Sequence, residues 1–293
     1  MGGILMKAKY FIHVIFIVFS AIFIIPFLYA ISISLTSESI IQEHGYKLIP
    51  PYLDFIAYQT IFRNLEEIVR AYGVTIFTTF VGTFLSILVM ALCAYPLSRP
   101  DFKWRYPLTF IIFFTMIFGG GLIPTYILIT QYYGLGNTIW VYIFPTLANA
   151  FHIIIFRTFF AGLPFSLIES AKLDGASELK IFFQIILPLS KPVIATIGLF
   201  NLLVRWNEWM TALIYIRDSE LYTLQFLLQR ILMEVEFINN IADQLPIGFG
   251  TMDVPTETVR FAMAIVAAGP MLFVFPFFQK YFAEGLTIGG VKG

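Results

Sequence analysis

Residues 11–35 read FIHVIFIVFSAIFIIPFLYAISISL, and the stretch holds no Asp, Glu, Lys or Arg. A run of eighteen or more apolar residues is long enough to cross a lipid bilayer as a helix. Lys7 and Lys9 precede the run, as basic residues precede the apolar part of a signal peptide. The run is too long for such a peptide, however, and it lacks a convincing cleavage site. We therefore predict that residues 11–35 form a retained first membrane span.

The composition of the whole chain agrees with a membrane protein. Of its 293 residues, 59% are apolar and only 12% are Asp, Glu, Lys or Arg, about half the charged fraction of a soluble domain. The 33 phenylalanines bring more apolar surface than one aqueous core can bury. The net charge is zero, so no general attraction for nucleic acid is expected. The lone Cys93 lies in an apolar run and is expected to be a small buried hydrophobe.

The predicted fold is all-α and polytopic, because lipid offers no partner to an unpaired backbone group and helices satisfy their own. We predict a single transmembrane domain over residues 11–282, preceded by the short segment 1–10 and followed by the tail 283–293. The glycine triplet at 119–121 permits either a helix break or close helix packing, of which we favour packing. Six spans fit the apolar runs, at roughly 11–35, 70–95, 106–131, 139–160, 190–214 and 259–282.

The orientation follows from the distribution of Lys and Arg, which gather on the cytoplasmic side of membrane proteins. One side combines both termini, the loop 96–105 and the region 157–191, and it carries eleven basic and five acidic residues. The other side carries six basic and twelve acidic residues in the loops 36–70 and 215–260. We therefore predict a multi-pass protein of the cell membrane with both termini in the cytoplasm.

The longest predicted cytoplasmic loop, residues 161–190, contains the polar stretch ESAKLDGASELKIFFQIILP at 169–188. Ser166 followed by Glu169 has the spacing of a capping box and predicts the start of a helix. Asp174 and Gly175 predict its end, because glycine readily takes the left-handed conformation that terminates helices. Ser177 then predicts the cap of a second helix.

The second helix of this loop has an apolar stripe. Its apolar residues recur at the spacing i, i+3, i+4 and i+7, which places them on one face. The first helix is too short to be stable alone in water, so the pair needs something to pack on. One alternative is a helix pair that lies on the lipid headgroups. The stripe consists of Leu179, Phe182, Phe183 and Ile186.

The spacing of the loop resembles the EAA signature of permease subunits in binding-protein-dependent ATP-binding-cassette importers. Glu169-Ser170-Ala171 is followed after three residues by Gly175 and after nine more by Ile185, and Leu187-Pro188 completes the pattern. Ser170 in place of the first alanine is the only departure. The resemblance implies a type I permease fold and a coupling helix that docks on the ATPase, in which Glu169 anchors the helix and Gly175 permits its turn. The coupling residues it implies are Glu169, Ser170, Ala171, Leu173, Asp174, Gly175, Ala176, Ile185, Leu187 and Pro188.

Three further segments resemble the carbohydrate branch of these permeases, particularly those for oligosaccharides and complex plant-type glycans. They are GGGLIPTYILITQYYGLGNT at 119–138, WNEW at 206–209 and the ending KYFAEGLTIGGVKG at 280–293. In some members of that branch the tail reaches between the two ATPase subunits. The tail residues implied in this contact are Leu286, Thr287, Gly289, Val291 and Lys292.

The function implied by the resemblance is ATP-driven carbohydrate import. The chain would form the path of the substrate through the membrane together with a second homologous permease. A pair of ATPase subunits would bind ATP and Mg, and an extracellular binding protein would deliver the sugar. Homodimer and heterodimer both remain open. Two alternatives remain open as well: an ion-coupled secondary transporter, and an importer of the same class for amino acids or peptides.

Polar and aromatic residues within the spans are candidates for the substrate path. Arg205 and Glu208 are three residues apart and can pair. Arg205 follows Lys191 by fourteen residues, about 21 Å along a helix, which places it in the outer half of the membrane. The alternatives are structural: an ion pair between subunits for Arg205, a hydrogen bond to a neighbouring helix for His152, and an interfacial belt for the aromatic residues. The candidates are Tyr126, Asn149, His152, Asn201, Arg205, Trp206, Asn207, Glu208 and Trp209.

The chain carries none of the common catalytic patterns. There is no GxxxxGK[ST] loop, so we do not expect it to hydrolyse ATP itself, and there is no HExxH or Gly-x-Ser-x-Gly pattern. We therefore predict a protein that is not an enzyme, with no catalytic residue, no metal site and no cofactor of its own.

Overall fold

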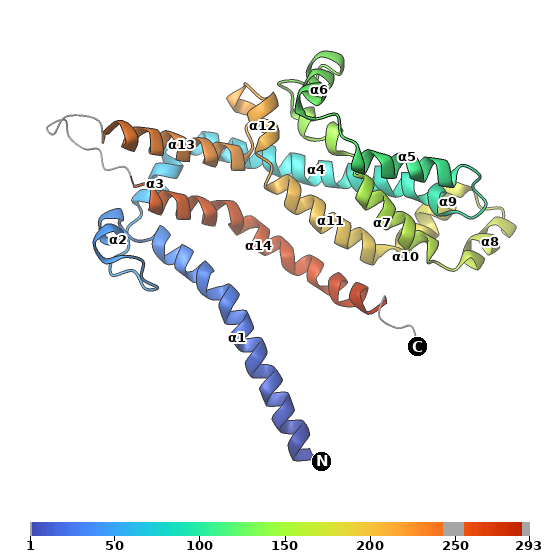
Figure 1. Cartoon of the computed structure of the whole chain (residues 1–293), viewed down its shortest axis with the longest axis horizontal. Coiled ribbons are helices and arrows are strands. Elements are labelled where there is room, and N and C mark those ends of the chain that lie inside the picture. Colours follow the sequence, from blue (N-terminus) through green and yellow to red (C-terminus); the bar gives the residue numbers. More distant parts are fainter. Residues whose placement is uncertain (1, 243–254, 289–293) are drawn as a thin grey trace. The chain divides into compact units, whose positions relative to one another are not determined.

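The computed structural model describes the backbone of residues 2–242 and 255–288 and the side chains of residues 9–238 and 255–279. Over these residues every regular element is helical (Figure 1). The predicted all-α class is confirmed for this part of the chain.

Three helices are long and apolar enough to cross a membrane unbroken. They correspond to the first, second and sixth predicted spans. The stretches that are long and apolar enough to cross a membrane are Lys9–Ser34, Ile56–Ser98 and Glu257–Gln279. The long helices themselves are α1 (Gly2–Ser34), α4 (Leu65–Ser98) and α14 (Glu257–Ile288).

The third and fourth predicted spans are bent pairs of helical segments, and in a further bent pair residues 178–189 of the predicted loop 161–190 precede the fifth predicted span. The first bend, of 113°, separates α5 (Arg105–Ile117) from α6 (Leu122–Ile127) and the π-helical turn Leu128–Tyr132. The second, of 49°, separates the 3-10 turns Ile139–Tyr142 and Phe144–Thr146 from α7 (Ala150–Ala161). The third, of 80°, separates residues 178–189 from α11 (Lys191–Trp206). If each bent pair is one span, the described residues hold up to six, and the count of six stays a prediction.

The glycine triplet breaks the helix, so the preference for close packing at 119–121 is wrong. Gly121 has φ +80°, which a right-handed helix does not contain. A side chain added at Gly119 or Gly121 would meet nothing within 4 Å, so none of the described helices approaches there. The break therefore comes from backbone freedom and not from helix contact.

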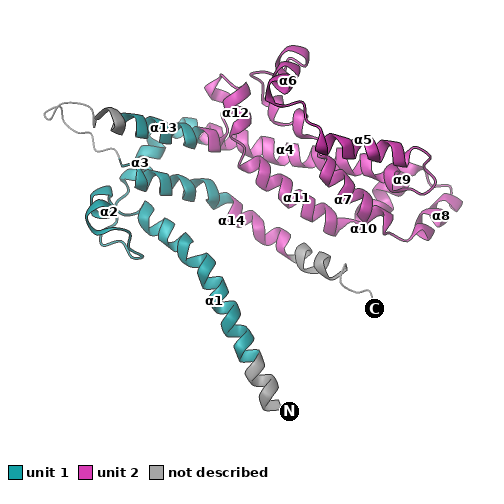
Figure 2. Ribbon diagram, viewed as in Figure 1, with its two compact units in different colours: residues 1–68, 227–270 teal, residues 69–226, 271–293 magenta. Residues whose placement is uncertain are grey.

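The chain divides into two compact units (Figure 2). Unit 1 comprises residues 1–68 and 227–270. In it, Glu38 of α2 (Glu38–His44) accepts hydrogen bonds from the amides of Glu257 at 3.1 Å and Thr258 at 3.0 Å, which caps the start of α14. The remaining helices of unit 1 are α3 (Ile56–Ile61), the 3-10 turn Phe62–Asn64 and most of α13 (Leu224–Ala242).

Unit 2 comprises residues 69–226 and 271–293 and has an apolar core where α4, α7 and α11 meet. Met90, Phe156 and Ile197 lie in that core, one from each helix. Ile181 and Phe182 of the loop 161–190 are buried in the same core. The loop is therefore packed onto the helices and not only onto a membrane surface. The other helices of unit 2 are α8 (Phe165–Leu173), α9 (Glu178–Ile181), the π-helical turn Phe182–Ile186, α10 (Leu187–Leu189), α12 (Met210–Tyr215) and the 3-10 turn Ser219–Leu221.

Candidate functional site

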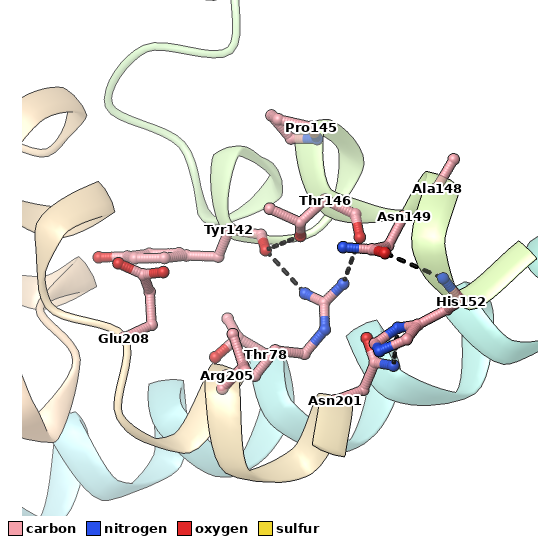
Figure 3. A pocket seen from close by; sticks show the side chains of 11 residues that line it. Thr78, Tyr142, Pro145, Thr146, Ala148, Asn149, His152, Asn201, Arg205 and Glu208 are labelled. Atoms are coloured by element: carbon pink, nitrogen blue, oxygen red, sulfur yellow. Dashed lines mark hydrogen bonds between the residues drawn. The ribbon is translucent and has the colours of Figure 1, made fainter. Parts of the chain in front are cut away.

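A cavity of about 290 Å³ lies in unit 2, between α4, the turns at 142–149, α7 and α11 (Figure 3). It brings together five of the nine candidates for the substrate path. These five residues are spread over almost sixty residues of sequence, from Asn149 to Glu208. We call it the Arg205 cavity. Its lining residues are Thr78, Tyr142, Pro145, Thr146, Ala148, Asn149, His152, Asn201, Val204, Arg205 and Glu208.

Arg205 is only 6% exposed and is held by three hydrogen bonds. Its Nη1 donates to the carbonyl oxygen of Tyr142 at 2.9 Å. Its Nη2 donates to Oγ of Ser86 at 2.7 Å and to the carbonyl oxygen of Thr146 at 3.2 Å. The guanidinium thus ties α11 to α4 and to the turns at 142–146, where the broken helix leaves carbonyl groups free to accept.

Gly82 of α4 makes room for this guanidinium. A Cβ added to Gly82 would lie 2.5 Å from Nη1 and 2.7 Å from Cζ of Arg205, closer than real side chains approach. Nε of Arg205 is buried and has no hydrogen-bond partner among the described residues. The site therefore contains a fixed cation with one unused donor.

Arg205 and Glu208 do not form the ion pair that their spacing predicts. Among the described residues, no salt bridge joins them, and Glu208 instead accepts a hydrogen bond from the amide of Thr211 at 2.8 Å. The reason is that α11 ends at Trp206, so the two side chains are no longer on one helix face. Figure 3 shows Glu208 on one side of the guanidinium and His152 on the other.

Asn149 and His152 are engaged in local and neighbouring contacts. Asn149 caps α7, because its side chain accepts a hydrogen bond from the amide of His152 at 3.1 Å. Nδ1 of His152 lies 3.3 Å from Nδ2 of Asn201 on α11. These two residues thus link α7 to α11 at the edge of the cavity.

The other four candidates lie away from the cavity lining. Tyr126 stacks on Tyr215, with ring centroids 5.6 Å apart. Trp206 is 3% exposed, so its ring is buried in the unit, while Trp209 is partly exposed. Asn207 donates to the carbonyl oxygen of Leu203 at 2.8 Å.

Sequence reasoning missed the contributions of Gly82, Ser86 and the segment 142–148. Pro145 within a predicted span was an available signal, since a proline frees backbone carbonyls that a buried donor can use. Gly82 and Ser86 carried no such signal, because a glycine or serine within an apolar helix is common. The described residues contain no group of three or more His, Cys, Asp or Glu side chains that could hold a metal ion.

The loop 161–190 has the predicted helix, glycine break and second helix. Gly175 has φ +76°, and the amide of Ala176 donates to the carbonyl oxygen of Ala171 at 2.9 Å, which closes the end of α8. Ser177 caps α9, with its side chain accepting from the amide of Lys180 at 3.4 Å. The predicted capping box is wrong: α8 begins at Phe165, so Ser166 lies inside the first turn and caps nothing.

The predicted apolar stripe divides between the core and the surface. Phe182 and Ile186 are buried, whereas Leu179 and Phe183 are exposed. The π-helical turn at 182–186 widens the helix there, so the i, i+3, i+4 pattern no longer lies on one face. Leu173 at the tip of α8 is 89% exposed. The outward apolar surface thus includes Leu173, Leu179 and Phe183.

The remaining motif residues are distributed along the same loop. Glu169 and Ser170 are exposed on α8, and Ala171 is buried beneath them. Leu187 and Pro188 form α10, which leads into α11 through the 80° bend. In the predicted tail, Leu286 and Thr287 fall in the end of α14, beyond the described side chains, and Gly289, Val291 and Lys292 lie outside the described residues.

Residues 61–288 match the model of a family described as binding-protein-dependent transport system inner membrane component. The chain is 41% identical over 277 residues to the polygalacturonan/rhamnogalacturonan transport system permease protein YtcP of Bacillus subtilis, covering 94% of this chain and 95% of that protein. It is 30% identical over 285 residues to the arabinooligosaccharides transport system permease protein AraQ of Halalkalibacterium halodurans, covering 95% and 94%.

A solved structure has a similar fold. It is the crystal structure of a bacterial ABC transporter involved in the import of the acidic polysaccharide alginate, with a TM-score of 0.79 and 31% identity to the matched chain. The alignment covers 94% of this chain and 96% of that one.

Proposed function

Because this chain belongs to the family of inner membrane components of binding-protein-dependent transport systems, we propose that it is the permease of an ATP-driven oligosaccharide importer. The relatives are permeases of sugar and oligosaccharide transport systems by name, and two of the matches are named for acidic glycans. We extend this to the present chain and propose a uronate-containing oligosaccharide as its substrate.

The observation that carries the proposal is the conformation of the loop 161–190. Its two helices place Leu173, Leu179 and Phe183 on the surface, although large apolar side chains are normally withdrawn from water. A partner protein that covers these residues would remove that cost. We propose that this partner is an ATPase subunit, which binds ATP and Mg, and that the loop is cytoplasmic.

The rest of the assembly follows from this arrangement. A second, homologous permease completes the pathway, and an extracellular binding protein delivers the sugar to the outer loops. The Arg205 cavity lies in the outer part of the path, where the polar groups of Asn149, His152 and Asn201 contact the hydroxyl groups of the passing sugar. Both termini are in the cytoplasm.

The test is purification of the tagged chain from its native membrane in mild detergent, followed by identification of the bound proteins and reconstitution into liposomes. We expect an ATPase and a second permease to copurify, and we expect uptake of labelled oligogalacturonate that requires internal ATP, Mg²⁺ and the binding protein. Uptake by the chain alone without ATP would overturn the proposal and favour an ion-coupled transporter. ATP-driven uptake of amino acids or peptides, with none of sugar, would overturn the substrate class.

Loop orientation is tested separately. In a Cys93→Ser background, Leu173→Cys provides a single thiol at the most exposed large apolar side chain of the loop. A membrane-impermeant maleimide should label it in inverted vesicles and not in intact cells. The opposite labelling pattern would place the loop outside the cell and contradict the proposal.

A further inference from the structure

A buried arginine joins the end of α4 to both helices of the loop 161–190. Arg99 directly follows α4 and is 4% exposed. Its Nε and Nη2 donate to the two oxygens of Asp101 at 3.0 and 2.7 Å, while its Nη1 donates to Oη of Tyr95 at 2.9 Å and to Glu178 at 3.3 Å. Lys172 closes the group, with Nζ 3.3 Å from Asp101 and 2.9 Å from Glu178. We call these five residues the Arg99 cluster.

The cluster draws its members from separate elements. Tyr95 belongs to the end of α4 and Arg99 directly follows it, while Lys172 belongs to α8 and Glu178 to α9. The hydroxyl of Tyr95 also donates to Glu178 at 2.6 Å, a short bond that fits a charged acceptor. The guanidinium of Arg99 additionally lies 5.4 Å from the ring centroid of Phe165, at the start of α8. One cation therefore contacts both helices of the loop.

Apolar packing leaves the loop open where the cluster lies. A cavity of about 370 Å³ adjoins it, lined by apolar side chains of α4 and α9 together with members of the cluster. Leu92, Pro96 and Leu179 are among its walls. Ile181 and Phe182 pack against α4 in the apolar core, whereas beside this unfilled space the start of α9 is held to α4 by the polar bonds of the cluster. The helices of the loop are too short to keep an orientation by themselves.

The other part of α4 leads to the Arg205 cavity. Ser86 of α4 accepts a hydrogen bond from Arg205, and Ser86 precedes Arg99 by thirteen residues, about 20 Å along a helix. One helix, α4, thus connects the two sites, with Arg99 directly after its end and the contact with Arg205 within its length.

We propose that Arg99 is a positioning residue that sets the angle of the coupling loop relative to α4 and so couples loop movement to the Arg205 cavity. The inference rests on the proposed function, since the loop moves only if an ATPase drives it. Arg99 touches neither nucleotide nor substrate, and its effect passes through Glu178, Lys172 and α4.

The first experiment measures the loop itself in the full-length chain. In the Cys93→Ser background, spin labels at Leu173→Cys on the loop and Phe84→Cys on α4 report their separation in nanodiscs; both sites are exposed. We expect Arg99→Gln to broaden the distance distribution at least twofold. Lys103→Gln, which removes an exposed charge four residues away and outside the cluster, should leave it unchanged. An unchanged distribution in Arg99→Gln would overturn the proposal.

The second experiment distinguishes positioning from simple stabilisation. In the reconstituted complex, the ATP hydrolysed per labelled oligogalacturonate imported should rise at least about fivefold in Arg99→Gln, within the range of coupling between protein sites. A residue with only a structural role would lower the yield of complex and leave this ratio unchanged, which would overturn the proposal. If Arg99→Gln does not fold, Glu178→Gln keeps the bonds between Arg99 and Asp101 and should raise the ratio in the same direction.

Failure of the inference and failure of the proposed function give different results. If the wild-type complex shows no ATP-driven uptake, the proposed function is wrong. If the wild type transports and Arg99→Gln keeps both a narrow distance distribution and the wild-type ratio, only the role of Arg99 is wrong.

Discussion

Replacing Gly82 by alanine is expected to disturb the anchoring of Arg205 and to destabilise unit 2. The new Cβ would lie 2.5 Å from Nη1 of Arg205, so the guanidinium must move. Although it is the far end of a flexible side chain, it is only 6% exposed and its hydrogen bonds hold it in place. Movement therefore breaks at least one of them.

The magnitude follows from these contacts. A hydrogen bond to a charged group contributes about 1.5–3 kcal/mol, and overpacking of a filled site costs about 1–3 kcal/mol. Alanine recovers about 1 kcal/mol because it favours the helix more than glycine does. We expect Gly82→Ala to lower the free energy of unfolding by about 1.5–5 kcal/mol.

The assay is titration of the purified chain with SDS in mixed micelles, with Gly73→Ala as the matched control. Gly73 lies on the same helix, and a Cβ there would meet nothing within 4 Å. A double-mutant cycle identifies the partner: in an Arg205→Met background, Gly82→Ala should cost less than about 1 kcal/mol, since Met adapts its shape. If Gly82→Ala costs the same in both backgrounds, or no more than Gly73→Ala, the reasoning is wrong.

Three further predictions concern the loop 161–190 and its cluster. Gly175→Val should weaken copurification of the ATPase while membrane insertion is retained, because φ +76° is strained for a branched residue. Gly175→Asn should retain copurification, since asparagine tolerates that conformation. Equal loss of copurification in both variants would contradict this reason. Ser177→Ala should destabilise the start of α9 by about 0.5–2 kcal/mol, which amide hydrogen exchange would detect as faster exchange there. Ser166→Ala is the control: it removes no cap and should not change amide exchange in α8. The hydrogen bond from Arg99 holds the pKa of Asp101 at about 2, below its usual value, so its carboxylate stabilises the loop fully above about pH 4 and loses this effect as the pH falls towards 2. Spin-label distances should broaden in that range. Asp101→Asn should weaken the dependence and leave the part due to Glu178, whose pKa is also lowered. An unchanged pH profile in this variant would show that Asp101 is not responsible.

Local patterns predicted those features that depend on local forces. The apolar runs predict the three long helices because length and hydropathy alone decide whether a helix can cross a bilayer. The stop at Gly175 and the cap at Ser177 are likewise local, and both were confirmed. The family resemblance, which rested on the spacing within the loop 161–190, is confirmed by the match over residues 61–288.

Features that depend on tertiary context were missed. The sequence at 119–121 permits both a helix break and close packing, and it does not display the φ of +80° at Gly121 or the open space around that residue. Pro164 directly precedes α8, so the helix begins before Ser166 could cap it. Arg205 was expected to find a carboxylate and instead bonds to carbonyl groups some sixty residues earlier. The contact between Arg99 and Glu178, which are 79 residues apart, was not anticipated either.

The exposure of the apolar part of α1 has a consequence for the lipid environment. The stretch of α1 that can cross a membrane, Lys9–Ser34, has 26 residues, and none of the 18 residues of its apolar window is buried. At about 1.5 Å per residue the stretch is about 39 Å long. The hydrocarbon layer of a typical bilayer is about 30 Å thick, so α1 exceeds it by about 9 Å. A helix with such hydrophobic mismatch tilts, kinks at Pro26 or thickens the surrounding bilayer. Acyl-chain length should therefore act on this helix more directly than substitutions between its apolar residues.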